Sequence, residues 1–525
     1  MDAPIPGWMV FPVVFAALYA SHFSLLRLPY YWDEAGYYIP AAWDFFRTGS
    51  LIPVTTLTNA HPPLPSIYLA LWWKLTGFVP EVTREAVLMV AATALMAVWR
   101  LAQRLAGSGE VAFWTVVLTG LYPVWFAQST LAHADIFAAA CTLWGLVYAL
   151  PEGERRPWIA AAWFMAAALC KETSIAVPMT LAAIAVVEGF RAAHAVRRRC
   201  WAEAAQLASS IVPLLGWYSW HFAKTGFVFG NPEYLRYNAQ ANMEPLRVLA
   251  AFGHRLLHLF AHMNMFVPVL LTLAALMLKP KLDARGQDRE RISERSMVRI
   301  AILLLVNALL FSVLGGALLT RYLLPMYPLV LVVAVSTFYR RVPFWQALAV
   351  FSAAAFVAGL FINPPYRFAP EDNLAYARVV RLHLAGIAQL NRRFPGSTVL
   401  SAWPVTDELT KPELGYVKAP TEVDRLEDFT AGQIDRAAAE PGRYSTALVF
   451  STKYDPSNLL LSLGPKSEKM DERYFGLHHD LAPEAIALRL GGTLVWESED
   501  HGQWIALIRF NRQFEAAAQP PEGLR

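Results

Sequence analysis

The chain has 525 residues, of which 56% are hydrophobic and only 16% are charged, and its mean hydropathy is +0.34. A soluble domain usually carries about 25% charged residues, so this composition excludes an ordinary soluble protein and indicates a polytopic membrane protein. The formal net charge of +4 is too small and too dispersed for a nucleic-acid-binding protein. The cysteines, Cys141, Cys170 and Cys200, show neither a disulfide framework nor metal-site spacing.

Long apolar runs recur along the first two thirds of the chain. A membrane-spanning helix needs about 20 mostly apolar residues, and by this rule we expect about eleven spans. The first run has no basic residues before it, so we expect a retained helix rather than a cleaved signal peptide. The expected spans are approximately 8–28, 83–105, 110–131, 133–150, 157–171, 172–189, 202–222, 262–279, 297–316, 321–339 and 342–362.

Basic residues predict the orientation of these spans. With the spans above, five Lys/Arg clusters fall on one side, which the positive-inside rule places in the cytoplasm. A helix at 60–78 would split the clusters between the two sides if it crossed the membrane, so we expect it to lie on the outer surface. The clusters are Arg100 and Arg104, Arg155 and Arg156, Arg191 to Arg199, Lys279 to Arg299, and Arg340 and Arg341.

The composition changes after residue 362, where Asn363-Pro364-Pro365 predicts a break. An amphipathic helix is expected at 371–393, and strands at 397–403, 446–453, 492–498 and 503–510. The predicted fold is therefore mainly α, a polytopic transmembrane helix bundle with a small C-terminal extracytoplasmic α/β domain. The predicted domains are 1–362, with a large first outer loop at 29–82, then 363–515, and a tail at 516–525.

Adjacent acids, Asp33 and Glu34, lie in the first outer loop, flanked by tyrosines and a tryptophan at 30–38. A charged pair between membrane segments is costly unless it faces water or does chemistry. We expect Asp33 to be a catalytic carboxylate held at the bilayer surface. The alternative is a solvated loop acid beside aromatic side chains of the membrane interface.

Further polar motifs face outward in the same topology, and each has a simpler explanation when taken alone. Asp135 suits a helix N-cap, and Arg321 suits a helix-end anchor whose charge reaches the interface. Lys171 and Glu172 suit a self-neutralising pair, and His61 suits an ordinary loop residue. Their joint placement on one face favours a shared site. The motifs are His61-Pro62-Pro63, His133-Ala134-Asp135, Lys171-Glu172 and Arg321-Tyr322.

Three histidines, His254, His258 and His262, recur at spacing i, i+4, i+8 and so share one side of a helix. Two histidines at i and i+4 can bind a metal ion. The alternative is an interfacial amphipathic helix whose polar stripe is rich in histidine. An intermediate interpretation has His258 alone pointing into an active cleft.

The order of these motifs carries a family resemblance. Trp32-Asp33-Glu34, His61-Pro62-Pro63-Leu64, His133-Ala134-Asp135, Lys171-Glu172 and Arg321-Tyr322-Leu323-Leu324-Pro325 follow one another as in polytopic glycosyltransferases that use polyprenyl-phosphate sugars. Over residues 8–362 the chain resembles the protein O-mannosyltransferase and aminoarabinose transferase group of the C-type superfamily. Many relatives have Lys-Pro-Pro where this chain has His61-Pro62-Pro63. A histidine can still donate to a phosphate, but its charge depends on pH.

The resemblance implies an inverting transfer of a hexosyl or pentosyl group from a polyprenyl-phosphate donor. The acceptor would be a hydroxyl of a glycan, lipid or protein at the outer face of the cell (inner) membrane. Relatives differ in metal use, so a divalent metal remains an open possibility and no other cofactor is expected. The implied catalytic residues are Asp33, Asp135 and Glu34, the phosphate-binding residues are His61, Lys171, Arg321 and Tyr322, and the supporting residues are Glu172 and His258.

Two other classes of protein fit part of the pattern. A transporter or flippase of lipid-linked sugars would use the same cationic cleft, but the inverted repeats typical of transporters are not visible. A membrane sensor with an outer domain would need no bond chemistry, and the acids clustered near the outer surface argue against it.

Overall fold

The computed structural model describes residues 7–150, 155–230, 232, 243–283, 286–314, 317–454 and 465–510. The chain divides into two compact units. The helical unit comprises 1–27, 37–364 and 368–376, and the sheet unit comprises 28–36, 365–367 and 377–525. The predicted fold class, a mainly helical bundle with a small C-terminal α/β domain, is confirmed. The predicted tail at 516–525 lies outside the described residues.

The first half of the helical unit follows local signals in the sequence. Proline opens several helices because its fixed φ suits a first turn, and glycine in the left-handed conformation ends α2 and α4. The expected span at 110–131 divides because Pro123 has no amide hydrogen to continue a helix. The elements are α1 (Gly7–His22), η1 (Phe23–Leu25), η2 (Glu34–Tyr38), α2 (Ile39–Thr48), α3 (Leu64–Thr76), α4 (Pro80–Ala106), α5 (Gly109–Leu121), α6 (Pro123–Gln128), α7 (Ala134–Ala149), α8 (Pro157–Cys170), η3 (Glu172–Ile175) and α9 (Ala176–Arg191).

The second half of the helical unit contains a sharp bend. Helices α13 and α14 meet at 97° across residues Met263 and Asn264, both of which have positive φ. The remaining elements of this unit are α10 (His194–Ala208), η4 (Ser209–Ile211), α11 (Val212–Thr225), α13 (Pro245–Phe260), η6 (His262–Asn264), α14 (Phe266–Leu276), α15 (Glu294–Val313), η7 (Thr320–Leu323), α16 (Tyr327–Arg341), α17 (Trp345–Phe361) and η8 (Pro370–Asp372).

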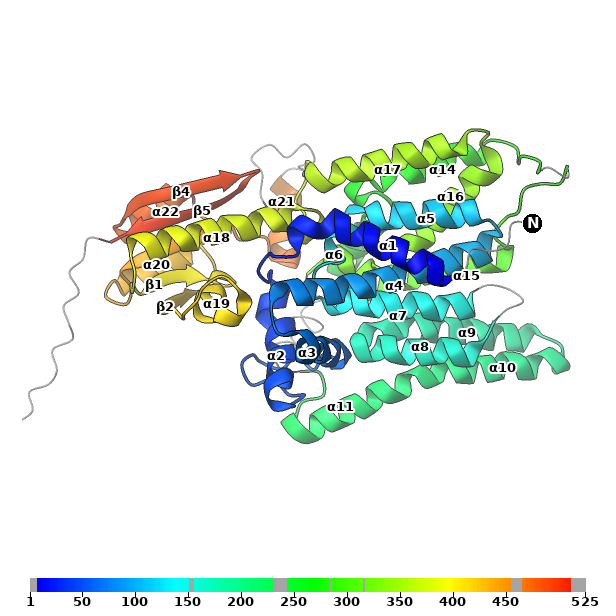
Figure 1. Ribbon diagram of the computed structural model, residues 1–525, viewed down its shortest axis with the longest axis horizontal. Helices are drawn as coiled ribbons and strands as arrows, with labels where there is room; N and C mark the ends of the chain where they lie inside the picture. The colour runs from blue at the N-terminus through cyan, green and yellow to red at the C-terminus, as the bar shows by residue number, and fades with distance from the viewer. Residues whose placement is uncertain are drawn as a thin grey trace, which may run out of the picture. The chain divides into compact units, whose positions relative to one another are not determined.

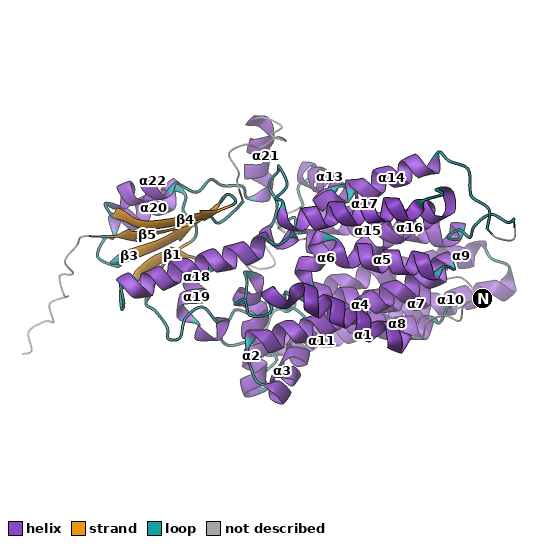
Figure 2. Ribbon diagram, turned by 45° about the horizontal axis from the view of Figure 1, so that its top comes forward, coloured by secondary structure: helices purple, strands orange, loops and turns teal. Residues whose placement is uncertain are grey.

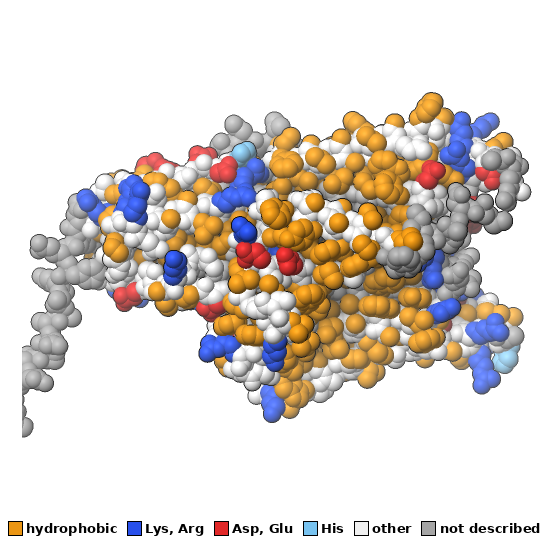
Figure 3. Space-filling view, viewed as in Figure 1, with side chains coloured by type: hydrophobic (Ala, Val, Ile, Leu, Met, Phe, Trp, Pro, Cys, Tyr) orange, Lys and Arg blue, Asp and Glu red, His pale blue; other side chains and the backbone are white. Residues whose placement is uncertain are grey.

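The helices lie side by side in a bundle whose visible face is broadly hydrophobic (Figures 1 and 3). By length and composition alone, three helices in the described part of the chain can cross a membrane, or four if the bent pair α13 and α14 is one span. Five shorter apolar helices accompany them. These features are those of a multi-pass membrane protein, and the expected number of about eleven spans stays a prediction.

One end of the bundle gathers several of the basic clusters. Arg104, near the end of α4, donates to the carbonyl of Val147 near the end of α7, at 2.9 Å. Arg299, near the start of α15, donates to the carbonyl of Ala149 and lies 3.0 Å from the carboxylate of Glu188 in α9. Clusters separated by about 200 residues in sequence therefore meet at one end, as expected from the positive-inside rule.

The sheet unit is a five-stranded mixed sheet in the order β2-β1-β3-β5-β4. Strand β1 pairs in parallel with β2 and β3, and β5 pairs antiparallel with β3 and β4. Helix α18 lies on one side of the sheet, and α20 and α22 lie on the other (Figure 2). The elements are α18 (Ala375–Arg393), β1 (Val399–Ala402), α19 (Val405–Thr410), η9 (Pro412–Leu414), β2 (Val423–Leu426), α20 (Ala431–Ala439), β3 (Thr446–Phe450), α21 (Pro465–Phe475), α22 (Pro483–Leu490), β4 (Thr493–Asp500) and β5 (Gln503–Arg509).

We predict that the sheet unit lies outside the cytoplasm. In a variant without the native cysteines, a cysteine replacing exposed Arg436 of α20 should react with a membrane-impermeant maleimide added to spheroplasts. A cysteine replacing exposed Gln287, within a basic cluster, should react only after permeabilisation. Labelling at Gln287→Cys and protection at Arg436→Cys in sealed spheroplasts would show the opposite orientation.

Candidate functional site

Buried charges from three parts of the sequence meet in the helical unit. Asp135 begins α7, Lys171 follows α8, and Arg321 lies in η7, and they are 4%, 7% and 3% exposed. The Lys171 ammonium donates to Asp135 Oδ1 at 2.6 Å, and Arg321 Nε lies 3.2 Å from Asp135 Oδ2. One carboxylate thus lies between two cations, so three of the expected site residues come together.

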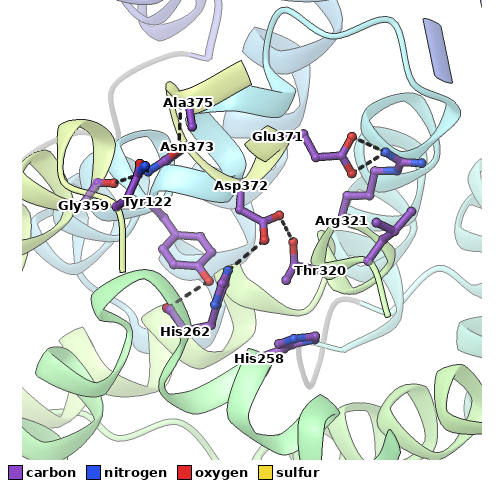
Figure 4. A network of polar contacts seen from close by, with 12 residues as sticks. Tyr122, His258, His262, Thr320, Arg321, Gly359, Glu371, Asp372, Asn373 and Ala375 are labelled. Atoms are coloured by element: carbon purple, nitrogen blue, oxygen red, sulfur yellow. Dashed lines mark hydrogen bonds and ion pairs between the residues drawn. The ribbon is translucent and has the colours of Figure 1, made fainter. Parts of the chain in front are cut away.

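A second carboxylate, that of Glu371 in η8, also binds Arg321. Both of its oxygens accept hydrogen bonds from Arg321 Nη1 (Figure 4). Glu371 is 3% exposed, so the whole group is removed from water. The sequence interpretation missed this residue. A signal was present, because Glu371 and Asp372 are adjacent acids after a predicted break, the same pattern that drew attention to Asp33 and Glu34.

Tyr322 is surrounded by cations. The Lys171 ammonium lies 4.0 Å from its ring centroid, and the guanidinium carbons of Arg255 and Arg321 lie at 5.6 and 5.9 Å. A ring face attracts a cation through its quadrupole, which suits this arrangement. The sequence interpretation assigned Tyr322 to the site but did not assign Arg255, which lies in the amphipathic helix α13.

Arg255 differs from the other cations in having no carboxylate among its described hydrogen-bond partners. Its Nε and Nη1 donate to the carbonyls of Phe311 and Leu319, at 3.0 and 2.7 Å, and its Nη2 has no hydrogen-bond partner in the described part of the chain. The residue is 0% exposed. Arg255 adds a third cation to Lys171 and Arg321 around Tyr322, and it also interacts electrostatically with the buried carboxylate of Asp372 and with Arg247.

His61 forms a neighbouring group with Glu172. Its Nδ1 lies 3.0 Å from the Glu172 carboxylate, and its ring stacks on Tyr38 with centroids 5.8 Å apart. His61 and Tyr38 border a small hollow, whose wall also includes Tyr37 and Ala134. Because Ala134 precedes Asp135, the hollow adjoins the buried charges along the chain.

His133 belongs to the His133-Ala134-Asp135 motif, but the sequence alone predicts no role for it. Its Nδ1 lies 2.8 Å from Gln128 Oε1, and since an amide oxygen only accepts, Nδ1 donates. The Nε2 atom is buried and has no hydrogen-bond partner among the described residues.

His258 and His262 lie beside Arg255 and Asp372. His262 Nε2 is 2.9 Å from Asp372 Oδ2, and the Thr320 hydroxyl donates to the same carboxylate (Figure 4). The His258 ring is 5.4 Å from that of His262, and its Nδ1 is 3.5 Å from Arg255 Nη1. Within the described ranges, no group of three or more His, Cys, Asp or Glu side chains is arranged to hold a metal ion.

Asp33 and Glu34 belong to the sheet unit rather than to the helical unit. Glu34 is fully buried, and its carboxylate accepts the amide hydrogen of Tyr31 at 2.9 Å, which closes a tight turn. Asp33 is partly exposed. Trp32 has φ 46°, a conformation that is strained for a bulky residue and that occurs disproportionately at functional sites.

The comparisons with known proteins agree with this fold. Residues 60–217 match the family model described as dolichyl-phosphate-mannose-protein mannosyltransferase. The fold is similar to that of ArnT from Cupriavidus metallidurans bound to undecaprenyl phosphate, with 16% identity, a TM-score of 0.55, and coverage of 95% of this chain and 98% of that chain. The apo state of the same protein matches with 15% identity, a TM-score of 0.53 and the same coverages.

A comparison with curated proteins finds no match. The family-model match confirms the predicted resemblance to the mannosyltransferase family over residues 60–217, and the likeness to ArnT is a likeness of fold.

We predict that Glu371→Gln destabilises the protein. Removing one partner from a buried ion pair leaves an uncompensated charge and costs about 3–5 kcal/mol of unfolding free energy. Glu81→Gln is the control, because the pair of Glu81 with Arg27 is exposed, and its loss should cost about 1 kcal/mol or less. Thermal unfolding in detergent measures both, and equal shifts in the two variants would contradict the prediction.

Proposed function

We propose that the protein transfers a sugar from a polyprenyl-phosphate donor to an acceptor hydroxyl, with inversion at the anomeric carbon, on the outer face of the cytoplasmic membrane. One observation carries the proposal: a buried cluster of cations contains a guanidinium, that of Arg255, whose Nη2 has no hydrogen-bond partner among the described residues. An isolated buried charge is costly, so this group favours an anionic ligand. A lipid phosphate supplies that charge next to apolar helices.

The donor phosphate would bind to Arg255, Lys171 and Arg321 around the Tyr322 ring. As the bond between the anomeric carbon and the phosphate oxygen breaks, its electron pair stays with the phosphate, whose negative charge increases. Fixed cations in a site shielded from water stabilise that developing charge, which is commonly the largest catalytic contribution. Arg255 is suited to this role because two backbone carbonyls orient its guanidinium, and no carboxylate is among its described hydrogen-bond partners.

The acceptor oxygen would attack the anomeric carbon from the face opposite the leaving phosphate, which inverts its configuration. Asp33 would take the proton of the acceptor hydroxyl as general base, so that its carboxylate becomes a carboxylic acid. The products are the glycosylated acceptor and polyprenyl phosphate. Asp135 would hold Lys171 and Arg321 in place, and Glu34 would hold the turn that presents Asp33.

The His61 hollow would accept polar groups of the donor. The ring of His61 lies between Tyr38 and Glu172, so its second nitrogen is directed by these contacts. His133 would hydrogen-bond to a sugar hydroxyl through Nε2, because that atom is buried and has no hydrogen-bond partner among the described residues. His258 would support Arg255. A divalent metal is given no role in these steps.

The comparisons support the donor class. The matching family model is named for mannosyl transfer from dolichyl phosphate, and the ArnT structure contains undecaprenyl phosphate. A transporter or flippase remains the second candidate, since it would bind the same headgroup. Incubating the purified protein with a panel of undecaprenyl-phosphate sugars and candidate acceptors separates the two. Release of undecaprenyl phosphate with sugar on the acceptor supports transfer, and movement of intact donor across vesicles supports transport.

We predict that Arg255→Gln weakens binding of undecaprenyl phosphate by about 10- to 150-fold, since a hydrogen bond to a charged group contributes about 1.5–3 kcal/mol. Arg247→Gln is the matched control, because Arg247 is a buried arginine of the same helix that donates to the carbonyl of Ser312. Equal affinities of Arg255→Gln and the parent protein in a titration with undecaprenyl phosphate would remove Arg255 from the phosphate site.

We predict that Asp33→Asn abolishes most transfer while donor binding and thermal stability persist. The amide keeps the size of the side chain but removes the proton acceptor, and general base catalysis contributes about 100- to 10,000-fold. Glu34→Gln should retain more activity, because an amide oxygen can still accept the Tyr31 amide hydrogen. A folded Asp33→Asn protein that transfers sugar near the parental rate would exclude Asp33 as the base, and Asp135 would be tested next.

A further inference from the structure

The segment that carries Asp33 packs with a part of the chain far from it in sequence. Residues 28–36, here called the Asp33 loop, lie between α1 and α2 in sequence but group with the sheet unit. The amide of Tyr30 donates to the carbonyl of Leu414 at 3.3 Å, and the hydroxyl of Tyr416 donates to the carbonyl of Tyr30 at 3.1 Å. Both backbone polar groups of Tyr30 are therefore bonded to the end of η9 and the residues that follow it.

The other half of the Asp33 loop packs against a tryptophan of the sheet unit. The ring of Trp32 meets that of Trp403 edge-on, with centroids 4.9 Å apart. Gly36 lies so close to the same indole that an added Cβ would be 2.8 Å from Trp403 Cζ2. Trp403 directly follows β1, so the contact lies at the carboxyl end of a parallel strand, the edge where open α/β sheets place functional loops.

The loop between these two contacts has a conformation that it would not keep alone. Trp32 has φ 46°, and such strain persists only where the surroundings hold it. The amides of Glu34 and Gly36 donate to the carbonyls of Tyr31 and Trp32, at 2.9 and 2.8 Å. Since Asp33 lies inside this turn, its direction depends on the turn being held.

The residues that follow Trp403 are held in place by a buried hydrogen-bonded pair, His383 and Glu408. His383 of α18 lies 2.9 Å from the carboxylate of Glu408 in α19, and both residues are less than 5% exposed. The amide of Glu408 donates to the carbonyl of Pro404, next to Trp403, at 3.0 Å. Trp403 is therefore attached to the core of the sheet unit rather than carried on a separate loop.

We propose that the sheet unit positions the general base, with Trp403 and Tyr416 as positioning residues that hold the Asp33 loop in its reactive conformation. This inference rests on the proposed function, in which Asp33 takes the acceptor proton. It gives the C-terminal domain a role in the chemical step, beyond covering the site or binding the acceptor. Displacing the turn would lower the turnover rate while leaving the donor-binding cations of the helical unit unchanged.

The test uses the full-length protein and two substitutions at the contact. Gly36→Ala forces the turn away from Trp403, and a shift of about 1 Å in a reacting group can cost on the order of 100-fold in rate. Tyr416→Phe removes one hydrogen bond and should lower kcat about 5- to 10-fold, as expected for the loss of about 1 kcal/mol. Affinity for undecaprenyl phosphate should stay within about twofold in both, since that ligand contacts the helical unit only in this proposal.

Matched controls separate positioning from general destabilisation. Gly386→Ala places a Cβ 2.6 Å from Ile505 inside the sheet unit, and Tyr444→Phe removes a buried hydroxyl that donates to the carbonyl of Ala437. Both should lower the melting temperature and leave kcat within about twofold at a temperature where the variants are folded. The double variant with Trp403→Phe and Gly36→Ala should have a kcat at least tenfold higher than that of Gly36→Ala alone, because the smaller ring leaves room for the new methyl group.

Hydrogen exchange measures the contact without activity. Amides of residues 28–36 should exchange faster in Tyr416→Phe and Gly36→Ala than in the controls. If Asp33→Asn is inactive but Gly36→Ala loses no more kcat than Gly386→Ala, the positioning role is overturned and the proposed function stands. If Asp33→Asn is active, both the base assignment and this inference are overturned. A specific loss of kcat with rescue by Trp403→Phe supports the inference.

Discussion

The helical unit depends on one buried guanidinium. Arg321 lies between Asp135 and Glu371, residues that come from the start of α7 and from η8, so three distant segments converge on one charge. Apolar helices in lipid gain little from hydrophobic association with one another, because lipid tails are as apolar as their side chains. Buried ion pairs, in contrast, are strongly unfavourable when one partner is missing. The charge network therefore specifies which helix ends meet, and the same charges form the surface that a phosphate would contact.

The pattern of the sequence predicted most of the elements, because their signals are local. Apolar runs of helical length became α4, α7 and α15, and β-branched runs became β3 and β5. The short strand β2 was missed because its four residues, Val-Asp-Arg-Leu, carry two charges and little alternation. Pro123 divides the expected span at 110–131, and Met263 and Asn264 lie at the bend between α13 and α14. The effect of such residues depends on how the neighbouring helices pack.

The site was only partly predictable for a different reason. Asp135, Lys171 and Arg321 were placed on one face by topology, and the structure brings them into contact. Arg255 and Glu371 were missed because both lie in segments whose pattern already had an explanation as an amphipathic helix with charged residues on its polar face. Nothing local to them shows that their partners are Tyr322 and Arg321, which adjoin each other more than 40 residues away.

The bond between Tyr416 and Tyr30 has a consequence for the newly made polypeptide. The two residues are 386 positions apart, so at about 5–20 residues per second the ribosome needs roughly 20 to 80 s to supply the second after the first. During that interval the early helices can enter the membrane, but the turn with Asp33 has no partner to hold it. A nascent or prematurely ended chain would thus have membrane helices without a formed turn at Asp33. Acquisition of activity would be among the last events of biosynthesis.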